Sequence, residues 1–324
     1  MALGDIHTCF SGNPLDRADH LRTDPEIFGE FMQQEDARVV LLAGAGKQTE
    51  DQIRVSLAAE SRILTDAAGD IAWQHPKTLK FLPVSTIIFL GLDGTAPRYG
   101  VMLDGSADDF THMFEADHCK FRDGRGIAFK LGGPHPSLGI IAQAKSMLLW
   151  HESHRFCAKC GIESTLAKAG YERKCSACNT SHFPRTDPVV IMLILDEASG
   201  GEKALVGRGI GWPEGHYSAL AGYMEPGESM EEAVAREIYE EVGLVTTKVT
   251  YKASQPWPWP STLMIGVEAW VESGTLNIDH TELEDAIWIS KKDVRASIKG
   301  AHPHRLLPPP FAIAHDLVKA WLEA

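Results

Sequence analysis

The sequence predicts an α/β protein of several domains with a small metal-binding module between them. Its 324 residues suffice for roughly two or three separate cores. The near-continuous apolar run 189–195 is typical of a strand buried on both faces, and the segment 229–243 has the periodicity of an amphipathic helix. Four cysteines in two close pairs precede that strand, which indicates a metal-binding module.

Charge and composition limit the classes of partner. The chain carries 31 basic and 44 acidic residues, a net charge of −13, with 44% hydrophobic and 23% charged residues. This balance is ordinary for a soluble globular protein and argues against broad electrostatic binding to nucleic acid or an anionic membrane. Residues 1–30 lack the apolar core of a signal peptide, and no apolar run approaches the roughly 18 residues of a membrane span. We therefore expect a cytoplasmic protein without membrane or DNA partners.

The first 135 residues carry few chemical signals. Apolar runs bounded by turn residues predict strands at 39–42, 86–90 and 99–103. Gly44-Ala45-Gly46-Lys47 lacks the spacer and the second Gly-Lys-Ser/Thr element of a phosphate-binding loop, so we assign it to a turn. After a break at 132–136, residues 137–151 have the spacing of a helix that leads into the cysteines.

The cysteine pairs predict a structural zinc site. Cys157 and Cys160 form one Cys-x-x-Cys knuckle, and Cys175 and Cys178 form a second one after fourteen residues. Two knuckles at this distance provide four thiolates in tetrahedral geometry, with no open position for water. One Zn²⁺ per chain would then fold the module and take no part in catalysis. A disulfide or redox pair is the alternative, which a reducing cytosol disfavours.

The helix at 229–243 carries the strongest local signals. Pro226-Gly227 predicts a tight turn, Ser229 with Glu232 predicts a capping box, and Gly243 predicts a left-handed C-cap. A buried apolar stripe is expected at helical spacing: Met230, Val234, Ile238 and Val242.

The opposite face of this helix is acidic. Glu237, Glu240 and Glu241 stand at i, i+3 and i+4, where like charges destabilise an isolated helix. Such a cluster indicates a divalent cation held by carboxylate oxygens, with an ordinary solvated acidic face as the alternative. Arg236 beside it is suited to a bidentate grip on a carboxylate.

The spacing of this segment resembles a family box. Gly222, Glu228, Arg236-Glu237, Glu240-Glu241 and Gly243-Leu244 match every fixed position of the box that defines the Nudix hydrolases. The resemblance implies an enzyme that hydrolyses a nucleoside diphosphate linked to another group, using Mg²⁺ or Mn²⁺.

The remaining elements around the box are predicted from pattern. Residues 204–208 should pair with 189–195 through the turn at 199–201, and 217–221 should be a short strand entering the box. Downstream we expect strands at 248–253 and 263–271, an acidic loop at 279–285, and a helix at 311–322 with proline in its first turn.

Residues 254–261, Ser-Gln-Pro-Trp-Pro-Trp-Pro-Ser, alternate three prolines with two tryptophans. They cannot form a central strand, because proline donates no ladder hydrogen bond. Two interpretations are open: a polyproline segment that docks an aromatic-reading partner domain, or a rigid wall whose aromatic platform receives a base or nicotinamide ring.

This octad resembles the signature of the NADH pyrophosphatases, the Nudix subfamily that includes NAD-capped RNA hydrolases. The four-cysteine ribbon before the Nudix part and the Leu-Leu-Pro-Pro-Pro stretch at 306–310 are also characteristic of it. The resemblance covers residues 150–324. It implies an N-terminal α+β domain at 1–135, a connecting helix at 136–152, a zinc ribbon at 153–184, and a Nudix α/β/α sandwich with a mixed sheet at 185–324.

The resemblance also implies site residues. The metal-binding positions are the carboxylates of Glu237, Glu241 and Glu282, with Glu240 completing the cluster and Ala221 contributing its carbonyl; Glu284 is the neighbouring alternative to Glu282. Arg236, Glu237, Glu240 and Glu241 are the catalytic positions of the box. Aromatics that stack on the nicotinamide end match Phe183 and Tyr223, a position that is often Phe in relatives. The substrate wall matches Ser254, Gln255, Pro256, Trp257, Pro258, Trp259, Pro260, Ser261 and Ala314.

The function implied is hydrolysis of NADH or NAD⁺ to nicotinamide mononucleotide and AMP, or removal of an NAD cap from RNA 5′ ends, by a homodimer. Roughly two or three Mg²⁺ or Mn²⁺ ions per site would orient the attacking water and lower its pKa. One of Glu240, Glu241 and Glu282 is expected to act as general base, and the sequence does not choose among them. The alternative is a Nudix hydrolase of ADP-ribose or a dinucleoside polyphosphate. A third interpretation is a zinc-ribbon binding protein with an idle hydrolase fold. The presence of every catalytic glutamate argues against it.

Overall fold

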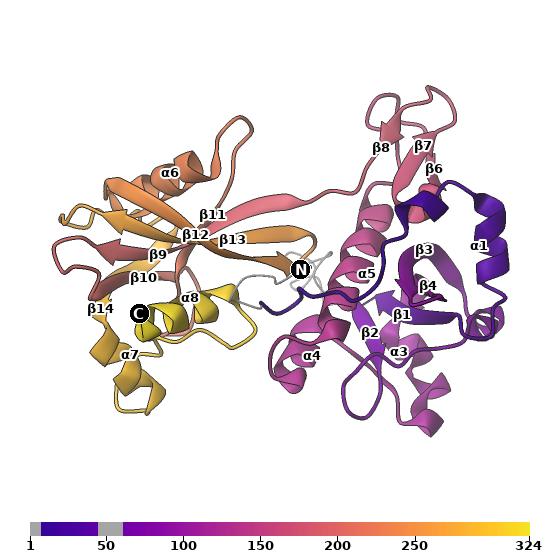
Figure 1. The fold of residues 1–324 in the computed structure, drawn as a ribbon, viewed down its shortest axis with the longest axis horizontal. Helices are drawn as coiled ribbons and strands as arrows, with labels where there is room; N and C mark the ends of the chain where they lie inside the picture. Colours follow the sequence, from indigo (N-terminus) through magenta and orange to yellow (C-terminus); the bar gives the residue numbers. More distant parts are fainter. Residues whose placement is uncertain (1–7, 45–60) are drawn as a thin grey trace. The chain divides into compact units, whose positions relative to one another are not determined.

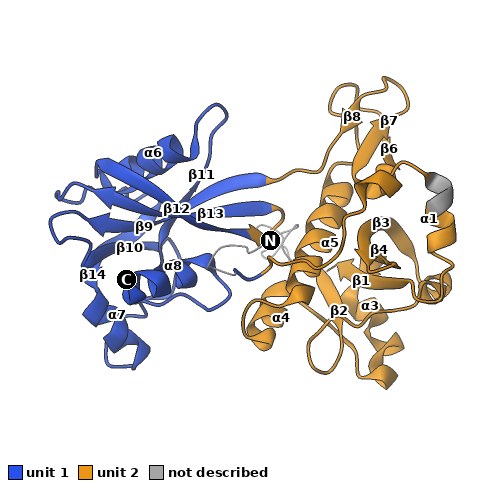
Figure 2. Ribbon diagram, in the orientation of Figure 1, with its two compact units in different colours: residues 1–9, 187–255, 262–324 blue, residues 10–186, 256–261 orange. Residues whose placement is uncertain are grey.

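The computed structural model describes residues 8–44 and 61–324, which form two compact units (Figure 2). Unit 1 contains 187–255 and 262–324 together with the described residues 8–9, and unit 2 contains 10–186 and 256–261. The turn predicted at 44–47 lies almost entirely outside the described residues. None of the described helices is long and apolar enough to cross a membrane.

Unit 2 is built on a five-stranded sheet in the order β3-β4-β1-β2-β5 (Figure 1). Its strands are β1 (Arg38–Gly44), β2 (Arg62–Thr65), β3 (Val84–Asp93), β4 (Ala96–Ser106) and β5 (Lys120–Arg122). β1 runs parallel to β4, and the other pairs are antiparallel. The three strands predicted in this part of the chain are confirmed. β2 and β5 were not predicted, because strands of four and three residues carry too little pattern.

Helix α5 packs on this sheet against β3 and β4. It spans Pro136–Ser153, as the sequence predicts, and begins with His135 as N-cap and Pro136 at its first position. The other helices among the described residues of unit 2 are α1 (Pro25–Phe31), α3 (Ala107–Phe110) and α4 (Gly124–Leu131). Single 3-10 turns are η1 (Asp19–Leu21), η2 (Pro76–Phe81), η3 (Thr111–Met113), η4 (Glu115–Asp117) and η5 (Lys168–Gly170).

The cysteine module is a small antiparallel sheet that follows α5 directly. Its strands are β6 (Ser164–Ala167), β7 (Glu172–Cys175) and β8 (Ser181–His182), in the order β6-β7-β8.

Unit 1 contains a six-stranded mixed sheet in the order β12-β13-β9-β10-β14, with β11 also paired to β9. The strands are β9 (Asp187–Asp196), β10 (Lys203–Gly209), β11 (Leu220–Tyr223), β12 (Thr246–Trp257), β13 (Thr262–Val271) and β14 (Leu283–Ser290). β13 runs parallel to β9, whereas β10 and β11 run antiparallel to it.

Alternate residues of β9 serve two separate cores. Val190, Met192 and Ile194 pack with helix α6 (Met230–Val242) on one face of the sheet. The intervening residues pack with α8 (Ile313–Glu323) on the other face, beside α7 (Lys291–Ile298) (Figure 1). Unit 1 is therefore an α/β/α sandwich, and the predicted doubly buried strand is confirmed.

Three predicted boundaries in unit 1 are wrong. The strand expected at 217–221 lies at Leu220–Tyr223, because the backbone N–H groups of Tyr217 and Ser218 instead bond to the carbonyls of Arg305 and Gly207. The acidic loop ends at residue 282 and β14 follows, since Arg208 on β10 neutralises Glu284 at 2.7 Å. The last helix starts at Ile313, so Pro310 lies outside its first turn.

The Trp-Pro octad is divided between strand and loop. β12 stands at the edge of the sheet and continues through Pro256 to Trp257. An edge strand tolerates proline, so the exclusion from a central strand holds although the segment is partly extended.

Candidate active site

The turn and helix of the box form as their residues dictate. Ser229 donates its backbone N–H to Glu232 at 2.7 Å and accepts one from the Glu232 backbone at 3.3 Å, which completes the capping box. Gly243 ends α6 in the left-handed region at φ 71°. Val234, Ile238 and Val242 are fully buried. The acidic face is thereby turned away from the core.

Three carboxylates converge at this face. Oxygens of Glu237, Glu241 and Glu282 lie within 4.8 Å of one another. The first two project from α6 and are 8% and 4% exposed, while Glu282 is exposed. Backbone N–H groups fix the turn that carries Glu282: Asp279 donates to the carbonyl of Glu241 at 2.9 Å, and Glu282 donates to Asp279 at 3.1 Å.

Glu284 is engaged elsewhere. Its carboxylate accepts from Arg208 at 2.7 Å and from the backbone N–H of Gly211 at 3.0 Å. The structure therefore brings Glu282, and not Glu284, to the two helix glutamates.

Burial and mutual repulsion shape the electrostatics of this cluster. Burial, and then the charges of Glu237, Glu282 and Glu240, raise the pKa of Glu241 to about 8. Burial likewise raises the pKa of Glu237, against the opposing effect of Arg236. Oε2 of Glu241 is buried and has no hydrogen-bond partner. Converging hard oxygens with one such orphaned acceptor fit a divalent cation.

Arg236 holds the outer wall of the site. Its guanidinium grips Glu228 with two bonds of 2.6 and 3.0 Å, and donates to Glu237 at 2.8 Å and Glu240 at 2.9 Å. It also donates to the backbone carbonyl of Tyr223 at 2.9 Å. Glu240 is therefore bound to Arg236 on the exposed side, and the structure does not bring it into the converging group of three carboxylates.

Strand β11 gives the helix room to approach. A Cβ on Gly222 would lie 1.9 Å from Cδ of Glu237, so only glycine admits that carboxylate. Ala221 precedes it on the same strand, opposite Ile191 of β9.

The residues expected at the nicotinamide end have different environments. Tyr223 on β11 is 59% exposed, and Phe183 in unit 2 is 63% exposed. Ala314, in the first turn of α8, is buried in the core. Gln255 is also buried and bonds to the backbone of Cys9, Phe311 and Ile313, while the carbonyl of Ser254 accepts from Thr8.

The two tryptophans of the octad lie in unit 2. The rings of Trp257 and Trp259 are 4.7 Å apart, and Phe10 meets both edge-on. Lys145, fully buried on α5, donates to the carbonyl of Pro258 at 2.6 Å. Lys145 is not among the site residues that the sequence predicts, although a lone charge in the otherwise apolar middle of a helix is a visible signal.

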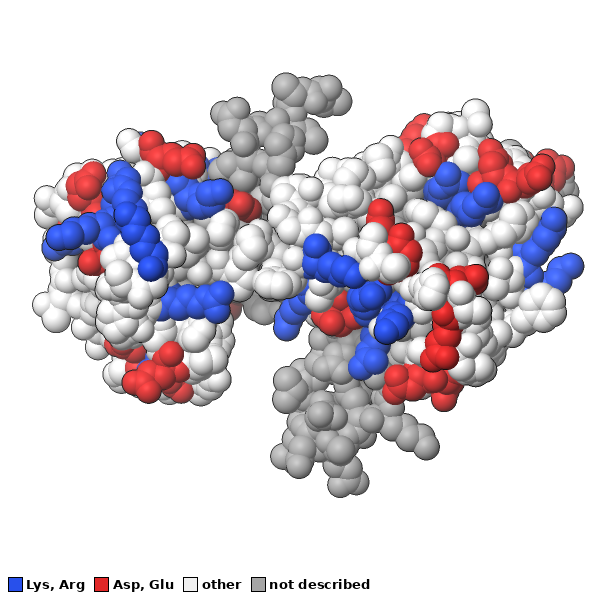
Figure 3. Space-filling view, turned by 90° about the horizontal axis from the view of Figure 1, so that it is seen from below, with Lys and Arg blue, Asp and Glu red and all other residues white. Residues whose placement is uncertain are grey.

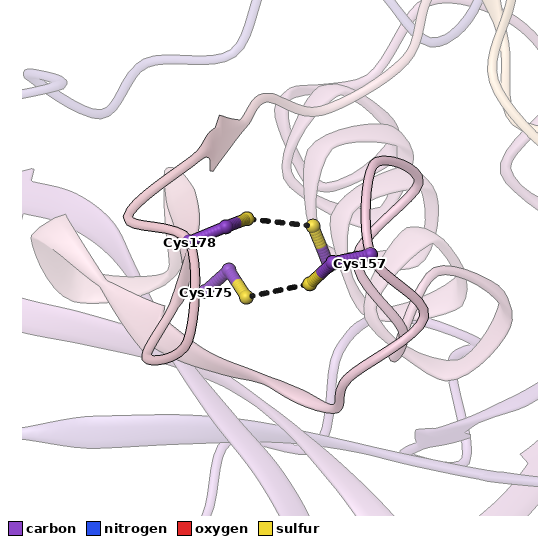
Figure 4. Close-up of side chains that lie close together, drawn as sticks. Cys157, Cys175 and Cys178 are labelled. Atoms are coloured by element: carbon purple, nitrogen blue, oxygen red, sulfur yellow. Dashed lines mark hydrogen bonds between the residues drawn. The ribbon is translucent and has the colours of Figure 1, made fainter.

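The four cysteine sulfurs lie within 4.8 Å of one another (Figure 4). Sγ of Cys157 is 3.6 Å from that of Cys178, and Cys160 is 3.5 Å from Cys175. Sulfurs about 2.3 Å from a common Zn²⁺ would be separated by about 3.8 Å in a tetrahedron, so the donor set fits zinc. Hydrogen bonds from Thr180 lower the pKa of Cys178 to about 6, which favours the thiolate form that binds metal.

The ribbon is fastened to α5 through a buried polar network. Arg173 on β7 donates to Ser164 at 2.9 Å and lies 3.2 Å from Nδ1 of His151. Nε2 of His151 donates to the carbonyl of Gly170 at 2.8 Å. Burial lowers the pKa of His151 to about 4, so the neutral ring serves as both acceptor and donor.

Comparison with known proteins gives matches along most of the chain. Residues 185–309 match the NUDIX domain, 152–183 the NADH pyrophosphatase zinc ribbon domain, and 40–150 the NADH pyrophosphatase-like rudimentary NUDIX domain. The chain is 32% identical over 316 residues to the NAD-capped RNA hydrolase NudC of Mycobacterium bovis, covering 94% of this chain and 92% of that protein.

Two animal proteins are similar over a smaller share of their length. The NAD-capped RNA hydrolase NUDT12 of Homo sapiens is 34% identical, with 90% of this chain and 66% of that protein covered. The mitochondrial NAD(P)H pyrophosphatase NUDT13 of Mus musculus is 41% identical, with 61% and 58% covered. The chain thus spans somewhat less than two thirds of the length of these relatives.

Proposed function

Because this chain belongs to the NADH pyrophosphatase family of Nudix hydrolases, we propose that it hydrolyses the diphosphate bond of NADH and NAD⁺. Water adds across the P–O–P linkage. NAD⁺ then gives nicotinamide mononucleotide and AMP, and NADH gives reduced nicotinamide mononucleotide and AMP. At the 5′ end of an NAD-capped RNA the same reaction leaves a 5′-monophosphate. The observation that carries the proposal is the convergence of Glu237, Glu241 and Glu282, with a buried oxygen that lacks a partner.

The chain's own residues divide the work. Glu237, Glu241 and Glu282, with the carbonyl of Ala221, would hold two or three Mg²⁺ or Mn²⁺ ions. When bound, such ions neutralise diphosphate oxygens and lower the pKa of a water molecule. Arg236 fixes the carboxylate of Glu237 from outside.

The proton of the attacking water needs an acceptor. Glu240 is already bonded to Arg236 at 2.9 Å, which makes it a poor general base. Glu241 and Glu282 are the remaining candidates, and both belong to the converging group.

The nicotinamide end would be held by aromatic side chains. Tyr223 and Phe183 offer exposed rings, and the segment 254–261 supplies the wall. Buried Gln255 bonds to the backbone N–H of Ile313 at 2.9 Å, next to Ala314. Ala314 would therefore support the wall from behind and not touch the substrate.

The remaining parts would have structural roles. One Zn²⁺ held by Cys157, Cys160, Cys175 and Cys178 would fold the ribbon at 153–184. In the sequence, the ribbon would stand between two parts of the chain. The N-terminal domain at 1–135 with its connecting helix at 136–152 precedes it, and the Nudix domain at 185–324 follows it. The active form would be a homodimer, which light scattering of the purified protein tests.

Free dinucleotide and capped RNA are both proposed substrates. On the face drawn in Figure 3, described basic and acidic side chains occur in small interspersed groups. Within neither unit does this pattern suggest a long RNA-binding track, so recognition would centre on the NAD cap.

A substrate panel tests the proposal. Purified protein with Mg²⁺ should convert NADH to equal amounts of AMP and reduced nicotinamide mononucleotide, and parallel reactions with NAD-capped RNA rank the two substrates. ADP-ribose and a dinucleoside polyphosphate serve as competitors. A strong preference for either of them over NADH would assign the chain a different Nudix activity.

A further inference from the structure

The middle of the Trp-Pro octad belongs structurally to unit 2. Residues 256–261 group with 10–186, although the strands on either side of them belong to unit 1 (Figure 2). Besides joining two neighbouring strands, residues 256–261 therefore make contacts of their own within unit 2. The contacts of this loop are specific.

Lys145 makes the central contact. Its side chain is fully buried, and Nζ donates to the carbonyl of Pro258 at 2.6 Å. The same nitrogen lies 5.1 Å from the centre of the Trp259 ring, within the range of a cation–π contact. A single amine therefore engages both the backbone and a ring of the loop.

Residues of the N-terminal segment and of α4 also contact the two tryptophans. Phe10 meets the rings of Trp257 and Trp259 at 6.2 and 5.3 Å, with an interplanar angle of 84° in each case. Cζ of Arg125 lies 5.0 Å from the centre of the Trp259 ring. Gly124 leaves room for that ring, since a Cβ there would stand 3.2 Å from Trp259.

Burying the amine of Lys145 is electrostatically unfavourable. Burial and the charge of Arg125 lower the pKa of Lys145 to about 7, while Asp123 raises it. A buried aliphatic side chain would avoid this penalty, but it could not orient a carbonyl. Buried polar groups of this kind specify one arrangement at the expense of stability.

We propose that the other residues of unit 2 set the conformation of residues 256–261, and that Lys145 is a positioning residue for binding of the nicotinamide end. The inference rests on the proposed function, in which the octad forms the wall of the nicotinamide site. Unit 2 would then have a role that the sequence of residues 1–135 does not reveal, which is to fix the conformation of residues 256–261.

The test compares two ligands that differ at the nicotinamide end. NADH is the substrate, and ADP-ribose, as substrate or competitive inhibitor, shares the rest of the molecule without the nicotinamide ring. Lys145→Met removes the amine and keeps an unbranched side chain that is one heavy atom shorter. Lys130→Met is the matched control, because Lys130 also donates to a backbone carbonyl, that of Ala67 at 2.7 Å, away from the octad.

Lys145→Met should raise KM for NADH about tenfold, the scale of one weakened aromatic stacking contact, with kcat and the affinity for ADP-ribose near wild type. The quantity compared is the ratio of KM for NADH to the dissociation or inhibition constant of ADP-ribose. Gly124→Ala, which pushes on Trp259 without altering the amine, should raise this ratio as well. Lys130→Met should leave it unchanged. If Lys145→Met does not fold, Gly124→Ala decides by the same ratio. Equal effects on both ligands, or no effect in a folded variant, would overturn the inference.

A spectroscopic arm separates this inference from the proposed function. In protein labelled with 5-fluorotryptophan, the ¹⁹F signals of Trp257 and Trp259, assigned through Trp→Phe variants, should shift in Lys145→Met and stay in place in Lys130→Met. Absence of NADH hydrolysis by the wild type refutes the proposed function. Unmoved fluorine signals refute the placement by Lys145, whatever the substrate.

Discussion

Gly222 leaves the space that the carboxylate of Glu237 fills. A Cβ at residue 222 would stand 1.9 Å from Cδ and 2.1 Å from Oε2 of Glu237, well inside any permitted contact. The strand that enters the box and the helix that leaves it are thus matched at a single atom position.

Replacing Gly222 by alanine should therefore displace Glu237 from the converging carboxylates. We expect kcat on NADH to fall about a hundredfold or more, the usual consequence of a misplaced catalytic group. Gly227→Ala is the control, because no atom lies within 4 Å of its Cβ position, although its φ of 98° will cost some stability. Near-normal activity of folded Gly222→Ala would mean that the position of Glu237 is not critical.

Arg236 should not be replaceable by lysine. Its planar guanidinium makes two bonds to Glu228 while also reaching Glu237, which an ammonium group cannot reproduce. We expect Arg236→Lys to lower kcat on NADH about tenfold or more, since the carboxylates lose their orientation. Arg98→Lys, which alters an arginine in unit 2 that pairs with Asp93, should retain normal kinetics.

Zinc should be essential to the ribbon and absent from the chemistry. Cys175→Ser should reduce zinc content, measured by atomic emission, from one ion per chain to below one half, and lower the melting temperature. Cys119→Ala, at a buried cysteine outside the cluster, should keep the full zinc content. Undiminished zinc in Cys175→Ser would remove this residue from the ligand set.

Lys145 should impose a pH dependence on stability. Its pKa is about 7 in the folded protein against 10.5 as the ordinary value, so between these limits the unfolded chain binds a proton that the folded chain does not. Stability from this group then rises as pH increases from 7 to 10.5, by at most about 1.4 kcal/mol per pH unit. Urea unfolding should show Lys145→Met gaining most over wild type at or below pH 7. A difference between the two proteins that is constant from pH 6 to 10 would contradict the shifted pKa.

The sequence predicted the box because its signals are local. Ser229, Glu232 and Gly243 specify both ends of α6 through contacts within the helix and its caps, so pattern alone located it. The doubly buried strand β9 was equally legible, since each of its faces meets a helix layer.

Elements stabilised by distant partners were missed or misplaced. β14 begins with acidic residues that resemble a loop until Arg208 and Tyr217, more than 60 residues away, neutralise Glu284 and bind Asp285. The choice between Glu282 and Glu284 depends on the same contacts. Lys145 has a partner 113 residues away, which no local pattern could identify.

The proposed function requires that the converging carboxylates of Glu237, Glu241 and Glu282 bind divalent cations. Manganese titration followed by electron paramagnetic resonance, on chelator-stripped wild type, Glu241→Gln, Glu282→Gln and Glu284→Gln, tests it most directly. We expect wild type and Glu284→Gln to bind Mn²⁺ alike, while Glu241→Gln and Glu282→Gln each lose about tenfold or more in affinity. Equal Mn²⁺ binding by all four proteins, or none by the wild type, would contradict it.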